Sequence, residues 1–236
     1  MKWHQLYNIG IGVLFCFTAC DEGKIYPEEI IDTGRTATLT VTFTGLDAWP
    51  RENTLSLCSY SDDKSQPLLS KRITKPTREG KEITVTLNNL PAETRTIELA
   101  VISRGLKEVY AYYAYEVDNT SDEQIVLTLG ELDLASFDRI QKQIFDLNCL
   151  SCHGESTSLA GNLDLREGTA YQSLVNVKAP LSEEGKNYIT PNDIHNSFLL
   201  DILEDNPIHS DMFNSSGKQE VLSLIRGWIS GGAENN

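Results

Sequence analysis

The sequence is poor in several residue types that carry chemistry in proteins. Of its 236 residues, five are cysteine, four are histidine and two are methionine. Basic residues are also scarce, because the sequence has 20 Lys and Arg but 34 Asp and Glu, which gives a net charge of −14. Such an acidic chain repels nucleic-acid phosphates, so we expect no nucleic-acid partner and instead a partner with a basic surface. Hydrophobic residues at 40% and charged residues at 23% exclude a largely disordered or collagen-like chain.

The N-terminal apolar run, from Ile9 to Ala19, is too short for the roughly 20 residues that span a bilayer. It follows Lys2 and fits the apolar core of a secretory signal peptide. The run ends in Phe17-Thr18-Ala19-Cys20, which resembles the lipobox of bacterial lipoproteins, with Phe17 where that family usually has Leu. The resemblance implies cleavage before Cys20 and a lipid on Cys20. The alternative is an ordinary secretory cleavage, with Cys20 incidental.

We therefore expect a signal peptide at residues 1–20 and a polar tether at residues 21–34. The expected location is the bacterial cell envelope, on the periplasmic side or at the outer membrane or surface. Lipid on Cys20 would attach the chain to the membrane.

Residues 35–131 alternate between apolar and polar residues, as half-buried strands do. Strand-like runs occupy residues 36–44, 54–60, 82–90, 94–103, 108–117 and 124–129. This pattern predicts an antiparallel β-sandwich of immunoglobulin or fibronectin type. The segment has no histidine and no evident catalytic grouping, and Cys58 is expected to be a small core residue.

The one aromatic cluster in this segment consists of Tyr110, Tyr112, Tyr113 and Tyr115. On a strand, the first two share one face and the last two the other. We favour packing of one pair in the core over a carbohydrate-binding platform.

Residues 132–236 switch to a helical period. Ser136 is a plausible N-cap, and Phe137, Ile140, Ile144 and Leu147 would form one apolar stripe. A second helix is expected to start at Thr190–Asp193, and the last to run from about Lys218 to Ser230, with Trp228 buried against the first. The first helix leads into Cys149-Leu150-Ser151-Cys152-His153.

Cys-x-x-Cys-His in an exported chain is the attachment motif of c-type haem. Two thiols at this spacing can each form a thioether with one vinyl group of the same porphyrin, and the adjacent His153 can bind the iron. Three alternatives exist. A zinc site normally has four ligands, often with a second Cys pair, and no such pair is present. A thioredoxin-like redox pair normally lies in a βαβ unit, whereas the flanking pattern here is helical. Cys149 and Cys152 could also form a simple disulfide.

A low-spin electron-transfer haem needs a sixth iron ligand, and a Met ligand raises the reduction potential. Met212 is the only methionine after the predicted signal peptide, and it precedes a polar loop-like stretch, so we expect it to be the distal ligand. His209 and His195 are the rival ligands. If Met212 does not ligate the iron, peroxidase activity or binding of a small gas becomes possible.

The C-terminal stretch of roughly 100 residues resembles the single-haem cytochrome c domain. The matching stretches are Phe137–Gly154, Asn162–Leu165 with Ala170–Val177, Ile189–Ile202, and Met212 with Gln219–Ala233. Within them, Phe145 lies four residues before the first haem cysteine, and Trp228-Ile229 precedes Gly-Gly-Ala. It implies an all-α cytochrome c-like domain at residues 132–236, haem c bound covalently at Cys149 and Cys152, and iron held by His153 and Met212. One departure is Phe213, where the family usually has Pro after the distal Met.

The expected architecture is thus a β-sandwich domain at 35–131 followed by an α domain at 132–236. The expected function is that of a membrane-anchored electron carrier rather than an enzyme, exchanging single electrons with redox proteins through haem iron. Four residues are candidates for the haem pocket wall, namely Leu163, Leu165, Phe198 and Leu199. The alternative is a surface binding lipoprotein whose sandwich recognises a glycan or protein, with the haem domain accessory.

Overall fold

The computed structural model describes residues 34–121, 123–154 and 159–236. The predicted signal peptide with Cys20, and the predicted tether up to residue 33, lie outside the described residues. The described residues all belong to one compact unit. Within the described ranges, no helix combines the length and apolar character needed to cross a membrane.

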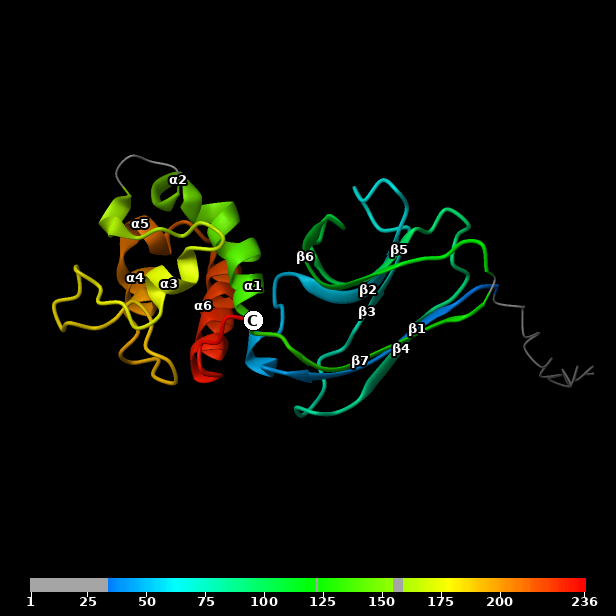
Figure 1. Ribbon diagram of the computed structural model, residues 1–236, viewed down its shortest axis with the longest axis horizontal. Helices are drawn as coiled ribbons and strands as arrows, with labels where there is room; N and C mark the ends of the chain where they lie inside the picture. Colours follow the sequence, from blue (N-terminus) through cyan, green and yellow to red (C-terminus); the bar gives the residue numbers. More distant parts are fainter. Residues whose placement is uncertain (1–33, 122, 155–158) are drawn as a thin grey trace, which may run out of the picture. The chain divides into compact units, whose positions relative to one another are not determined.

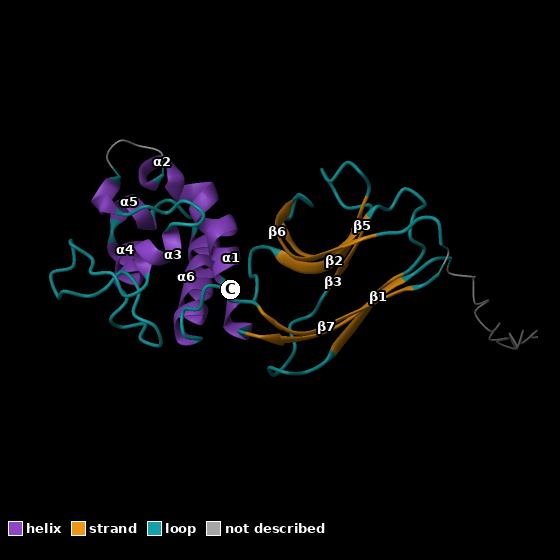
Figure 2. Ribbon diagram, viewed as in Figure 1, coloured by secondary structure: helices purple, strands orange, loops and turns teal. Residues whose placement is uncertain are grey.

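Two β-sheets, formed by the first 100 described residues, face one another (Figures 1 and 2). One sheet has the order β4-β1-β7 and the other the order β3-β2-β5-β6. The strands are β1 (Ala37–Thr44), β2 (Thr54–Tyr60), β3 (Leu69–Arg72), β4 (Ile83–Leu87), β5 (Thr96–Ile102), β6 (Glu108–Glu116) and β7 (Ile125–Asp133). The six strand runs expected from the sequence are all present, and β3 is an addition.

The alternation in β1 shows why this segment forms sheets. Its apolar residues Ala37, Leu39, Val41 and Phe43 are buried, while the threonines between them are partly exposed. Leu55 and Leu57 of β2 and Leu99 of β5 bury their side chains in the same core. Because side chains of a strand alternate between its faces, each sheet thereby gives one face to this core.

The sheet β4-β1-β7 differs from the expected fold. β1 pairs with β4 antiparallel but with β7 parallel, so the N-terminal part is not the wholly antiparallel sandwich that the sequence predicted. The β1–β7 register shifts between Thr40 and Val41, where Gly130 lies opposite Val41 with φ of 69°. Strand patterns show which faces are buried but not which strands are neighbours or in which direction they run, so they could not reveal this pairing.

Two details of the sheets confirm sequence-based predictions. Cys58 is fully buried. Tyr110 is buried and Tyr112 partly buried, and their hydroxyls donate hydrogen bonds to Asp138 Oδ2 (2.8 Å) and to the Leu134 carbonyl (2.9 Å). This pair packs inward, as expected, but Tyr113 and Tyr115 also pack against the core, where β6 shifts its register against β5. Recognition of a glycan by the sandwich stays a prediction.

The remaining described residues form short helices joined by irregular segments. The helices are η1 (Leu46–Ala48) between β1 and β2 and, after β7, α1 (Phe137–Ile140), the π-helical η2 (Gln141–Cys149), α2 (Leu150–His153), η3 (Ala160–Asn162), α3 (Ala170–Leu174), α4 (Phe198–Asp205), α5 (Pro207–Ser210) and α6 (Ser215–Ser230). Only α6 exceeds three turns of α-helix among them, and it confirms the predicted last helix.

The prediction of an all-α C-terminal domain is wrong. Between α3 and α4, residues 175–197 contain no helix and instead form isolated β-bridges such as Val175–Ile189 and Lys178–Asn187. Pro180 and Pro191 cannot donate the backbone bonds that a helix interior needs. The resemblance noted in the sequence therefore does not predict the fold of this segment.

The predicted helix start at Thr190–Asp193 is also wrong, since α4 begins at Phe198. The Ser197 hydroxyl donates to the Asp193 carbonyl at 2.7 Å and accepts from the Thr190 backbone N–H at 3.0 Å. Asn192 has φ of 62°, in the left-handed region that interrupts a right-handed helix. Side-chain bonds thus close this segment into a turn.

The predicted domain boundary, between residues 131 and 132, falls within strand β7. The division of the chain into two domains stays a prediction. One apolar core cluster includes residues of both parts, among them Leu39 of β1 and Ile225 of α6. Trp228 of α6 packs against Phe137 of α1 with ring centroids 5.2 Å apart, as the sequence predicted.

Candidate cofactor site

The Cys-x-x-Cys-His motif ends one continuous helical run formed by α1, η2 and α2. The Ser136 side chain caps the start of this run by accepting from the Arg139 N–H, as expected. Ile140, Ile144 and Phe145 bury their side chains, whereas Leu147 is 67% exposed. The wider π-helical turns of η2 change the angular spacing of side chains, so the stripe expected from an α-helical period does not include Leu147.

The run stops directly after His153. At Gly154, a Cβ atom would lie 2.5 Å from the Leu150 carbonyl oxygen, so only glycine fits this close approach. Twelve residues after His153, the Leu165 N–H donates to the His153 carbonyl at 2.9 Å, which ties the end of α2 to the segment that follows η3. The motif is therefore held from both sides.

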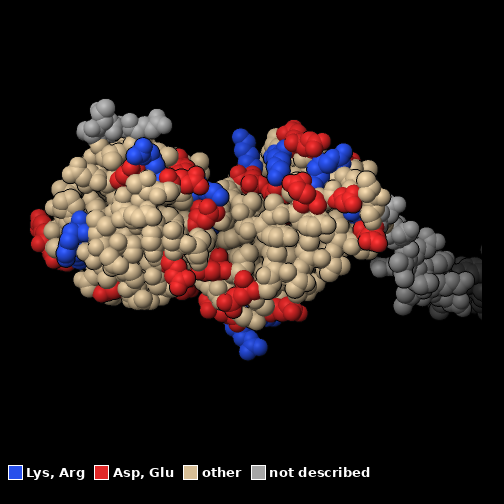
Figure 3. Space-filling model, viewed as in Figure 1, with Lys and Arg blue, Asp and Glu red and all other residues tan. Residues whose placement is uncertain are grey.

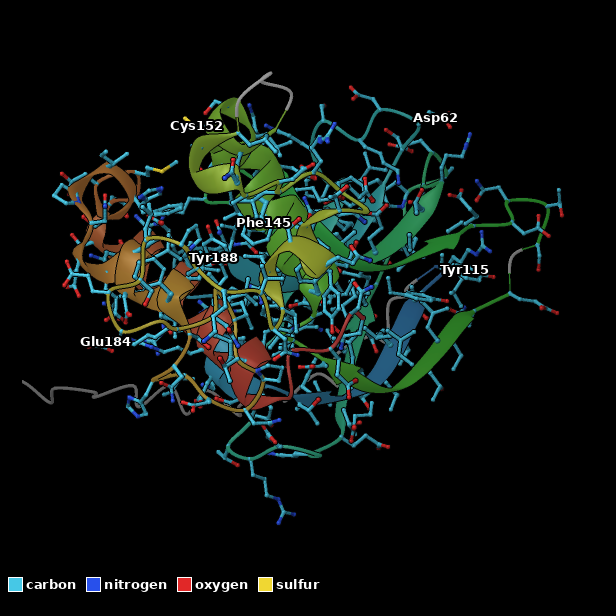
Figure 4. The ribbon with its side chains drawn as sticks, turned by 60° about the vertical axis from the view of Figure 1, so that its left-hand side comes forward. Asp62, Tyr115, Phe145, Cys152, Glu184 and Tyr188 are labelled. Carbon is cyan, nitrogen blue, oxygen red and sulfur yellow. The ribbon has the colours of Figure 1, made fainter. Side chains whose placement is uncertain are left out.

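A cavity of about 230 Å³ opens beside the motif. Its wall comes from η2, α2, η3, the irregular segments, α4 and α5 and is mostly aliphatic and aromatic. All four residues expected in a haem pocket wall line this cavity. Its cysteine and histidine residues are Cys149, Cys152, His153 and His209. The rest of the lining consists of Ile144, Phe145, Ala160, Gly161, Leu181, Tyr188, Ile202, Leu203 and Ile208. In Figure 4, Cys152 lies near the upper edge of the molecule, above Phe145 and Tyr188.

The two cysteines of the motif are free thiols. Cys149 is partly buried, and burial, followed by the proximity of Cys152, raises the pKa of its thiol to about 12. Cys152 is exposed. Because the structure joins neither sulfur in a disulfide, both remain available for a bond to a cofactor at the cavity wall.

His153 presents one ring nitrogen to the cavity. Its Nδ1 lies 3.1 Å from the Leu163 carbonyl oxygen. A carbonyl only accepts hydrogen bonds, so in the neutral ring Nδ1 carries the hydrogen and Nε2 keeps its lone pair. A backbone acceptor that fixes the tautomer and orientation of a ligating histidine is the usual companion of a metal-binding imidazole.

His209 lies on α5 and faces His153. The centroids of the two rings are 6.3 Å apart, and the ring planes are inclined by 35°. Asn206 caps α5 by accepting from the Ile208 N–H, and the same Oδ1 lies 3.3 Å from His209 Nδ1. Burial, and then the nearby His153, lowers the pKa of His209 below its ordinary value.

The other two candidate ligands are placed differently. Met212 lies in the turn between α5 and α6, is 43% exposed and is not among the residues that line the cavity. His195 is exposed in the turn before α4, where its backbone N–H donates to Asp193, and it does not line the cavity either. Of the three candidates for the distal position, His209 alone reaches the wall of this cavity.

Sequence reasoning did not identify Tyr188, Leu181 or Ile208 as cavity residues. Tyr188 is held by its hydroxyl, which donates to the Gly161 carbonyl at 3.1 Å. Leu181 and Ile208 are 70% and 77% exposed. No local pattern in the sequence marks these three, since they enter the site through turns and through the short α5.

The donor set and lining of the cavity fit a covalently bound haem. A porphyrin is broad and apolar and brings four nitrogen ligands for its iron, so the protein has to supply only axial groups and an apolar wall. The cavity offers two free thiols, an oriented imidazole and apolar side chains. Leu181 and Ile208 border it with exposed apolar surface that a bound porphyrin would cover.

A bare metal ion would need several side-chain ligands around one point. Among the described residues, no group of three His, Cys, Asp or Glu side chains has that arrangement. A scan against protein-family models finds no match to the chain, and searches among curated proteins and among solved structures return no match either.

Proposed function

We propose that the chain is a c-type haem protein that carries single electrons between redox proteins of the bacterial cell envelope. The observation that supports this most directly is the convergence of Cys149, Cys152 and His153 on the wall of one apolar cavity. When bound, the haem iron supplies the exchange between Fe(III) and Fe(II). The protein supplies attachment, axial ligation and exclusion of water.

Each thiol of the motif has a defined part in attachment. Each sulfur would add to the inner carbon of a vinyl group and its hydrogen to the outer carbon, so no atom would be lost and the chain would gain the full mass of the haem. His153 would hold the iron through Nε2, because its Nδ1 is engaged by the Leu163 carbonyl. Phe145 and Leu165 wall the cavity with buried apolar surface that keeps water from the cofactor.

The proposal includes a location and a kind of partner. Lipid on Cys20 would anchor the chain to a membrane of the envelope, and an electron-transfer partner would dock through a basic surface. On the face in Figure 3, the middle of the helical part carries few charged groups, and both acidic and basic groups lie along its margins. An uncharged centre with a charged rim suits a transient docking surface.

The test is covalent attachment of haem to the full chain. Expressed in a bacterium with a haem-attachment system, the protein should keep its haem after denaturation, with a mass increase of one haem. The double variant C149A/C152A should lose the covalent haem, whereas the control Cys58→Ala, far from the motif in sequence and buried in the sheets, should retain it. Wild-type protein with no covalent haem would refute the proposed function.

A further inference from the structure

The two imidazoles that face each other are spaced as ligands of one metal atom. A metal–imidazole bond measures about 2 Å, and a ring nitrogen lies about 1 Å from the centre of its ring, so two imidazoles on opposite sides of one metal have centroids about 6 Å apart. The observed separation between His153 and His209 is 6.3 Å.

Among the described residues, hydrogen bonding leaves the same nitrogen free on both rings. His153 Nδ1 is bonded to the Leu163 carbonyl at 3.1 Å, and His209 Nδ1 faces Asn206 Oδ1 at 3.3 Å. Both partners are oxygen acceptors, so both neutral rings carry hydrogen on Nδ1 and a lone pair on Nε2. The two bonds therefore prepare Nε2 of each ring for a metal.

The short helix α5 fixes the position of His209. Pro207 stands at its first position, where the missing N–H costs nothing, and Asn206 caps it. The Met212 N–H lies 3.4 Å from the His209 carbonyl, so both residues belong to the same turn. His209 takes the side of that turn that faces the cavity, while Met212 is 43% exposed.

We propose that His209, and not Met212, is the sixth ligand of the haem iron, so that the metal is held between two imidazoles. This inference rests on the proposed function, since it assumes an attached haem. Two nitrogen ligands give a lower reduction potential than a histidine with a methionine, because a Met ligand raises it. A filled sixth position also leaves no open site on the iron for peroxide or a small gas.

Optical spectra of the haem-loaded full chain identify the sixth ligand of the iron. Wild-type protein should be low-spin and should lack the far-red charge-transfer band of a sulfur–iron bond. His209→Ala should become high-spin, and added imidazole should restore the low-spin spectrum. Met212→Leu should keep both the wild-type spectrum and the wild-type midpoint potential. His195→Ala is the matched control, because His195 is exposed and away from the cavity, and its spectrum should not change.

The opposite pattern overturns the inference. A sulfur–iron band that Met212→Leu abolishes would make Met212 the ligand, and a low-spin spectrum that survives His209→Ala would exclude His209. If His209→Ala lowers the yield of folded protein, two other measurements still identify the sixth ligand. They are the presence or absence of a sulfur–iron band in wild-type protein and the midpoint potential of Met212→Leu. Covalent haem on denatured protein is independent of the sixth ligand, so failure of the proposed function is seen separately from failure of this inference.

Discussion

Arg139 and Glu220 face one another in the protein interior, with Arg139 Nη2 3.6 Å from Glu220 Oε1 and both side chains almost fully buried. Arg139 Nη1 also donates to the Ala48 carbonyl and to the Tyr112 hydroxyl, each at 2.8 Å. Glu220 Oε2 accepts from the backbone N–H groups of Arg51 and Glu52 at 2.9 Å. Burial alone would raise the pKa of Glu220, but these backbone bonds outweigh it and lower the pKa. The pair thus links α1 and α6 to the loops around η1.

Replacing Arg139 with Met should destabilise the fold by about 3 to 5 kcal/mol, because Glu220 would remain as a buried charge without its partner. Urea denaturation followed by circular dichroism measures this free energy of unfolding. The control is Lys142→Met, which removes an exposed ion pair with Asp138 and should cost about 0.5 kcal/mol or less. Equal losses in the two variants would show that the buried pair is not a determinant of stability.

Two glycines allow a matched test of local crowding. Gly45 and Gly80 have nearly the same backbone φ, 63° and 66°. A Cβ at Gly45 would lie 2.5 Å from Asp133 Oδ1, whereas a Cβ at Gly80 would meet nothing within 4 Å. Gly80→Ala should therefore lower the free energy of unfolding by about 1 kcal/mol, because alanine disfavours the left-handed backbone. Gly45→Ala should lower it by about 1 to 3 kcal/mol more, because the added Cβ also crowds Asp133. Thermal unfolding would contradict this reasoning if Gly80→Ala were the less stable variant.

Glu108 should make stability depend on pH. Glu108 keeps exposed surface, but partial loss of solvation around its carboxyl, and then a hydrogen bond with Glu98, raises its pKa from 4.5 to about 7, against the opposing attraction of Lys64. The folded state therefore binds the proton more tightly than the unfolded chain. As pH rises above about 4.5, Glu108 loses its proton in the unfolded chain but keeps it in the folded state, and this difference favours unfolding. The effect stops increasing near pH 7, where the folded state loses the proton as well. Stability should fall across that window.

The variant Glu108→Gln should show a smaller fall in the free energy of unfolding between pH values of about 5 and about 7. Urea titrations at the two pH values give this difference. Glu131→Gln, at an exposed position of β7, serves as the control and should keep the wild-type slope. An unchanged slope in Glu108→Gln would mean that this carboxyl does not retain its proton in the folded state.

The three described cysteines should differ in their reaction with iodoacetamide. In haem-free protein, exposed Cys152 should react first. Cys58 should react only in denaturant, because it has no exposed surface and burial, the largest influence, raises its pKa to about 12. In haem-loaded protein, thioether bonds should protect Cys149 and Cys152 even after denaturation. Peptide mass mapping measures each site, and native labelling of Cys58 at the rate of Cys152 would contradict the buried placement.

Where local pattern decides structure, the sequence predicted it well. The alternation of Ala37 to Phe43 marks β1, and the cap at Ser136 marks the start of α1. The strand β3 was missed because Leu69 is partly buried and the three residues after it are exposed, so this edge strand has no alternation. The parallel β1–β7 pairing joins residues about 88 positions apart, as in Ala37 with Ile125, and no local pattern encodes it.

The candidate site divides in the same way. Cys149, Cys152 and His153 are adjacent in sequence, so their chemistry is readable from the motif. The distal side depends on which residue of one turn faces inward, and His209 and Met212 are only three residues apart there. Spacing from the motif does not distinguish them, whereas the orientation of α5 does.

The parallel contact between β1 and β7 has a mechanical consequence. The chain enters the sheet at the start of β1, which lies between β4 and β7, and leaves it for the helical segment at the end of β7. A pull between these two points acts along the strands, so it loads the hydrogen bonds of the pair together in shear instead of opening them singly. If Cys20 tethers the chain to a membrane, strain from a docked partner would thus meet the sheet in its most resistant direction.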